Sequence, residues 1–139
     1  MAFDIGHRWG ADLDVSPTGD LAIVEGAPAA TQRILRRLLT NLGDYIWNPT
    51  YGAGLTQFVG MPTQSRQIAA IVRSQMLQEA GVARLPTPEI TVANPEGLGV
   101  GTFELSIRYK IEAGDGGCQD RNGACSYIAN GPGALCYDR

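Results

Sequence analysis

Hydrophobic residues recur along the chain with two different periods, which separate predicted helices from predicted strands. Over residues 29–41 they return every three or four positions, and this spacing predicts an amphipathic α-helix. The same period predicts a second helix, from a cap at Thr63 or Ser65 to about Ala80. Over residues 102–111 hydrophobic and polar positions alternate strictly, which predicts a half-buried β-strand.

Shorter segments complete the predicted α+β fold. Residues 12–25 predict a β-hairpin around the turn sequence SPTGD, and residues 88–93 predict a strand that pairs antiparallel with residues 100–111. Between the helices, residues 44–55 form an aromatic loop, because Pro49 and its glycines prevent a long regular element. The expected architecture is an N-terminal hairpin, two helices and a C-terminal two-stranded antiparallel element.

The chain is expected to form one domain between two different terminal segments. Its 139 residues favour a single core. We expect an irregular N-terminal arm at residues 1–11, a folded domain at 12–112, and a tail at 113–139. The tail is rich in glycine, holds three cysteines and has little apolar content, so it is expected to lie outside the core.

Composition and motifs argue against several functional classes. The net charge of −3 makes nucleic acid an unfavourable main partner, and no apolar run approaches the roughly 20 residues that cross a bilayer. The N-terminus does not resemble a secretory signal. The chain has one histidine, His7, and lacks the common nucleotide-binding, metalloprotease and serine-hydrolase motifs. We therefore expect no enzyme, and no catalytic, cofactor or metal site.

Residues 33–55, RILRRLLTNLGDYIWNPTYGAGL, resemble the gene-25-like, W-like baseplate proteins of contractile-tailed phages. The positions that fall on the family pattern are Asp44, Pro49, Tyr51, Gly52, Gly54 and Leu55. The order of elements over residues 12–112 also fits. Two features depart from the pattern: Asn41-Leu42-Gly43 replaces a proline before glycine, and the Glu-Pro-Arg triplet of some members is absent.

The resemblance implies a structural protein, the sheath initiator, located in the tail baseplate of a virion and assembled in the host cytoplasm. Its implied partners are the tail sheath protein, the baseplate wedge proteins, and the tail tube or tube-initiator protein, with six copies per tail. Such proteins template the first sheath ring by strand exchange, in which neighbouring chains complete the small sheet. The equivalent baseplate subunit of a type VI-like secretion or pyocin-type particle is an alternative.

Two sets of residues are candidates for these contacts. Aromatic and arginine side chains are enriched in protein interfaces, and the candidates for the wedge contact are Arg33, Arg36, Arg37, Tyr45, Trp47, Pro49 and Tyr51. An alternating strand with an open edge can accept a strand from another chain. The candidates for this strand exchange are Phe103, Leu105, Ile107, Tyr109 and Ile111.

Other interpretations remain open. Asp44 and Glu79 are the carboxylates that a small cell-wall hydrolase would use, and a cytoplasmic adaptor unrelated to tails is a further alternative. The spacing of Cys118, Cys125 and Cys136 does not match a compact zinc motif. We expect either a Cys118–Cys125 bridge, with Cys136 free or bridged to a neighbouring subunit, or three inert thiols.

Overall fold

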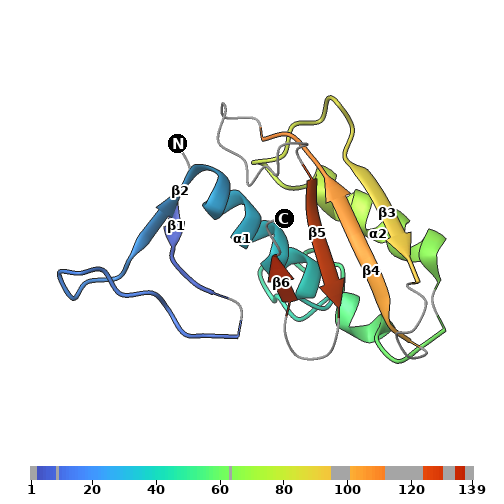
Figure 1. Ribbon diagram of the computed structural model, residues 1–139, viewed down its shortest axis with the longest axis horizontal. Helices are drawn as coiled ribbons and strands as arrows, with labels where there is room; N and C mark the ends of the chain where they lie inside the picture. The colour runs from blue at the N-terminus through green and yellow to red at the C-terminus, as the bar shows by residue number, and fades with distance from the viewer. Residues whose placement is uncertain are drawn as a thin grey trace.

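The computed structural model describes residues 3–8, 10–62, 64–94 and 101–111, together with two further strands, Ala124–Ala129 and Ala134–Cys136. The described elements are β1 (Phe3–Ile5), β2 (Ile23–Glu25), α1 (Gly26–Leu39), the 3₁₀ turn η1 (Leu55–Phe58), α2 (Ser65–Leu77), β3 (Glu89–Ala93), β4 (Phe103–Arg108), β5 (Ala124–Ala129) and β6 (Ala134–Cys136). Their arrangement is α+β, which confirms the predicted fold class (Figure 1).

The two helices form where the hydrophobic period predicts them. α1 begins three residues earlier than expected and carries Pro28 in its first turn. Proline is tolerated there because the backbone N–H groups of the first turn have no hydrogen-bond acceptor within the helix. Its buried face includes Ile34 and Leu38, and that of α2 includes Ile68 and Val72. These four side chains are at most 2% exposed and join one hydrophobic core.

A four-stranded antiparallel sheet, in the order β3-β4-β5-β6, packs against the helices (Figure 1). β3 pairs with β4 in a register that places Glu89 opposite Arg108, which confirms the predicted antiparallel pair. In β4, Phe103, Leu105 and Ile107 are only 1–2% exposed and belong to the core. The alternation along this strand therefore fixes which of its faces meets the helices.

Two strands of this sheet come from the glycine- and cysteine-rich segment. The sequence predicted a two-stranded element, whereas β5 pairs with the whole length of β4 and β6 pairs with β5. The physical reason is the edge of β4 opposite β3: its backbone N–H and C=O groups need partners, and the chain's own C-terminal segment supplies them. The described part of residues 113–139 thus extends the sheet.

The N-terminal region forms a long ribbon that projects from the body of the molecule (Figure 1). The expected hairpin is present as the bridge between Val15 and Leu21. The expectation of an irregular arm was wrong for residues 3–5, because β1 pairs antiparallel with β2. We call residues 3–8 and 10–25 the N-terminal ribbon.

Candidate interaction surfaces

A buried ion cluster lies between the two helices. Glu79, two residues after α2, is 5% exposed, and its two carboxylate oxygens lie 3.0 Å from Nε of Arg37 and 2.8 Å from Nη2 of Arg33. A carboxylate is costly to bury unless cations compensate it. The two arginines supply that compensation and tie α1 to the end of α2.

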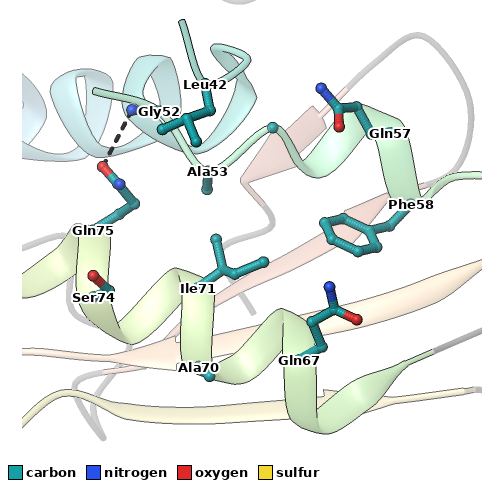
Figure 2. A pocket seen from close by; sticks show the side chains of 11 residues that line it. Leu42, Gly52, Ala53, Gln57, Phe58, Gln67, Ala70, Ile71, Ser74 and Gln75 are labelled. Carbon is teal, nitrogen blue, oxygen red and sulfur yellow. Dashed lines mark hydrogen bonds between the residues drawn. The ribbon is translucent and has the colours of Figure 1, made fainter. Parts of the chain in front are cut away.

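Gln75 of α2 attaches the aromatic loop to this cluster. Its amide nitrogen donates to the carbonyl of Thr50 (3.0 Å), and its Oε1 accepts from Arg37 (3.3 Å). The same oxygen accepts from the backbone N–H of Gly52 (3.2 Å), the bond drawn in Figure 2. Gly52 has φ +114°, and a Cβ there would lie 2.3 Å from the carbonyl oxygen of Thr40. Glycine is therefore required where the loop crosses the end of α1.

A row of aromatic rings leads from the ion cluster to the surface. The guanidinium of Arg37 lies 4.3 Å from the centre of the Tyr51 ring. The centres of the Tyr51 and Tyr45 rings are 5.4 Å apart, and those of the Tyr45 and Trp47 rings are 5.9 Å apart. Burial raises the pKa of the Tyr51 hydroxyl, although the positive charge of Arg37 opposes that effect. The row thus has an anchored inner end and a free outer end.

The outer end of this row belongs to an exposed apolar surface, which we call the loop patch. Its members are Leu42, Tyr45, Ile46 and Trp47, with exposed fractions from 44% to 79%. Large apolar side chains exposed on one loop are typical of protein interfaces, and Trp and Tyr are enriched at the energetic centres of such interfaces. The loop patch is therefore a candidate surface for a protein contact.

The structure separates the residues proposed for the wedge contact into two groups. Tyr45 and Trp47 are exposed in the loop patch, whereas Arg33 and Arg37 are occupied by Glu79. The remaining three are engaged within the chain: Arg36 pairs with Asp4 of β1, Tyr51 stacks under Arg37, and the carbonyl of Pro49 accepts from Gly43.

The hydrophobic period of the first predicted helix includes Leu42, so sequence reasoning did not identify it as an exposed residue, and Ile46 belongs to no such pattern. Sequence reasoning also missed Gln75, which looked like an ordinary polar helix residue. Its partners lie in the loop, 23 and 25 positions away. Only the exposed fractions and these hydrogen bonds identify the three residues.

The residues proposed for strand exchange lie on or just after the central strand β4. Phe103, Leu105 and Ile107 are buried in the core. Tyr109 shares a hydrogen bond with Thr31 through its hydroxyl (3.2 Å), and Ile111 forms an isolated bridge with Val82. In this chain both edges of β4 are paired, one with β3 and the other with β5.

A groove runs between α2 and the segment formed by the end of the aromatic loop and η1 (Figure 2). Its volume is about 520 Å³. The lining residues are uncharged and comprise Leu42, Gly52, Ala53, Gly54, Gln57, Phe58, Gln67, Ala70, Ile71, Ser74 and Gln75. In Figure 2, Phe58 and Ile71 project toward one another across its floor. The groove can accept apolar side chains from another surface.

The remaining chemistry-bearing residues are dispersed. Asp44 accepts from Asn41 (3.0 Å), whereas Glu79 is held by its two arginines. Over the described residues, no group of three or more His, Cys, Asp and Glu side chains is arranged to hold a metal ion. Cys125 lies opposite Ile107 in the sheet, and Cys136 lies opposite Tyr127. Cys118 lies outside the described residues, so the proposed bridge remains a prediction.

Neither of the two described helices has the length and apolar character that a membrane span requires.

Comparison with known proteins identifies the family. The family model for the contractile injection system sheath initiator matches residues 3–104, from β1 into β4. No curated protein matches the chain. The match includes the ribbon, both helices, the loop patch and β3, whereas β5 and β6 lie beyond it. Because this match covers well over half of the chain, the chain belongs to the contractile injection system sheath initiator family.

Proposed function

We propose that this protein joins the baseplate wedges to the first ring of the contractile sheath and templates that ring by strand exchange. The observation that carries the proposal is the family match over residues 3–104. The role is structural, in the baseplate of a tail, with six copies around its axis. Neighbouring genes would identify the particle as a phage tail or as a pyocin-type or type VI-like assembly.

The edge of β4 opposite β3 is the proposed acceptor for a strand from a sheath subunit. β5 occupies this edge and comes from the segment beyond the family match. Strand addition relies on backbone hydrogen bonds, so a neighbouring chain's arm can take the same place without changing the core. Phe103, Leu105 and Ile107 remain buried under the helices throughout and hold the register of β4.

The loop patch is the proposed contact with the wedge. Its exposed Tyr45 and Trp47 can enter apolar pockets of a partner, and the loop behind them is fixed by Gln75 and the Glu79 cluster. A surface held in its binding conformation loses less conformational entropy on association. Arg33 and Arg37 therefore contribute by positioning the loop.

The strand-exchange proposal is tested by locking β5 in place. In a background with all three native cysteines changed to serine, Ser106→Cys with Ser126→Cys joins β4 to β5 at positions that lie opposite each other. Thr91→Cys with Ser106→Cys is the matched control, which joins β3 to β4 through the same β4 residue. Each variant is mixed with the sheath protein of the same particle, and ordered sheath is counted by electron microscopy.

We expect the oxidised β4–β5 variant to nucleate no sheath, its reduced form to nucleate normally, and the β3–β4 control to nucleate in both states. Normal nucleation by the oxidised β4–β5 variant would show that β5 is not exchanged. If the cysteine-free parent and the native chain both fail to nucleate sheath, the proposed function itself is wrong.

A further inference from the structure

The N-terminal ribbon presents an apolar face that no described part of the chain covers. Antiparallel pairing places Ile5 opposite Ile23 and Val15 opposite Leu21, so the odd-numbered positions share one face. The exposed members of this face are Phe3, Ile5, Leu13, Val15, Leu21 and Ile23, with exposed fractions from 43% to 69%. An exposed apolar patch of this kind marks an interaction surface.

The opposite face of the ribbon is attached to α1. Asp4 pairs with Arg36, and the side chain of Gln32 both donates to the carbonyl of Ile5 (2.8 Å) and accepts from the N–H of His7 (2.8 Å). These contacts hold the ribbon away from the core with its apolar face toward solvent.

The ribbon that carries this face has an excess of negative charge. The described ribbon carries Arg8 as its one Arg or Lys residue, against the carboxylates of Asp4, Asp12, Asp14, Asp20 and Glu25. Asp12 and Asp20 are exposed at the turns of the ribbon, and Glu25 is exposed opposite Phe3. Two ribbons packed face to face would bring like charges together, which is unfavourable. The favoured partner is an apolar surface with a positive rim.

The groove beside α2 has these complementary properties. Its floor is uncharged and includes Phe58 and Ile71. Arg66 and Arg73 are exposed on α2, four residues before and three residues after the lining residue Ala70, spacings that make them its neighbours on the helix surface. Within the described part of the chain, neither arginine forms a hydrogen bond or ion pair. The groove therefore combines an uncharged floor, which includes two large apolar side chains, with a positive rim.

We propose that the N-terminal ribbon of one copy docks in the α2 groove of the next copy. The ribbon projects from one end of the molecule and α2 lies toward the other, so a copy cannot fill its own groove (Figure 1). An interface between two different surfaces of identical chains is head-to-tail, and such interfaces build rings when the rotation closes. The ribbon would thus connect neighbouring initiators directly, through a contact separate from the sheet.

The experiment is sedimentation velocity on the full chain over a range of concentrations and salt. We expect the native chain to self-associate, less strongly at high salt because exposed charges at the rim are screened. Val15→Asp in the ribbon and the pair Arg66→Glu with Arg73→Glu at the groove should each weaken association at least about ten-fold. Circular dichroism checks that each variant is folded.

Mixing the two variants provides the sharpest test. One retains an intact groove and the other an intact ribbon, so a head-to-tail interface predicts a heterodimer that grows no further. The matched controls are Leu85→Asp, at an exposed leucine, and Arg84→Glu with Lys110→Glu, at two exposed cations. Both controls should associate like the native chain.

Three results would overturn the proposal. A native chain that stays monomeric at every concentration has no such interface. Association lost in Val15→Asp but kept in Arg66→Glu with Arg73→Glu indicates contact between two ribbons. A mixture of the two variants that stays monomeric excludes the head-to-tail arrangement. These outcomes do not depend on the sheath, so they are independent of the strand-exchange test.

Discussion

The strand β4 and the N-terminal ribbon have the same alternating pattern of hydrophobic and polar residues, but they use it differently. In β4 the hydrophobic side chains are 1–2% exposed beneath the helices, whereas in the ribbon they are 43–69% exposed. Alternation specifies a strand with one apolar face, and the surrounding elements decide what covers that face. In β4 the apolar face stabilises the domain. In the ribbon it is available to another chain.

Truncating one isoleucine in each region should give the largest contrast in the free energy of unfolding. Ile107→Ala creates a cavity in the core and is expected to lower the free energy of unfolding by about 2–5 kcal/mol. Ile23→Ala in the ribbon removes a side chain that is 62% exposed and should cost less than about 1 kcal/mol. Urea denaturation of both variants measures the difference. Equal losses would mean that the ribbon belongs to the cooperative core.

Ion pairs should show a smaller contrast of the same kind. Glu79→Gln leaves Arg37, only 11% exposed, without its charged partner, and should cost about 2–3 kcal/mol. In the ribbon, Asp14→Asn breaks a pair with Arg8, whose side chain is 79% exposed, and should cost at most about 0.5 kcal/mol. Chemical denaturation at neutral pH tests both. A small loss for Glu79→Gln would refute the anchoring role of the cluster.

The smallest expected effect is a pH dependence of stability, which arises from Tyr51 in the aromatic loop and not from the ribbon. Because the folded-state pKa of Tyr51 is raised, folding favours its protonated form. The associated stability is present below the ordinary tyrosine pKa of about 10 and is lost as the pH rises through the folded-state value. Tyr51→Phe should therefore lose less stability than the native chain above pH 10. Thermal melts from pH 8 to 11 measure this, with Tyr45→Phe as the control at an exposed ring.

Local patterns were sufficient for the elements that bury their own hydrophobic residues. The helix periods located α1 and α2, and the alternation over residues 102–111 located β4 and its pairing with β3. They were not sufficient for β1 and β5. β1 has three residues and pairs with β2, about 20 positions later, while β5 follows a glycine-rich segment and pairs with a strand predicted to be open. Such pairings depend on which backbone edge is nearby.

The candidate surfaces show the same division. Aromatic residues in the loop sequence were enough to suggest Tyr45 and Trp47 as contacts. The sequence could not assign Arg33 and Arg37 to Glu79, because the partners lie more than 40 positions apart and meet only when α1 packs on α2. It also gave no sign of the groove, which exists only because η1 and α2 lie side by side.

The amino-acid sequence by itself determined the two helices, the central antiparallel pair and the family resemblance, since each rests on residues that are close together in the chain. The tertiary structure decided which apolar faces are covered, which charges are neutralised within the chain and which strand occupies the second edge of β4. These properties depend on contacts between distant segments, and burial and charge pairing have no local signature.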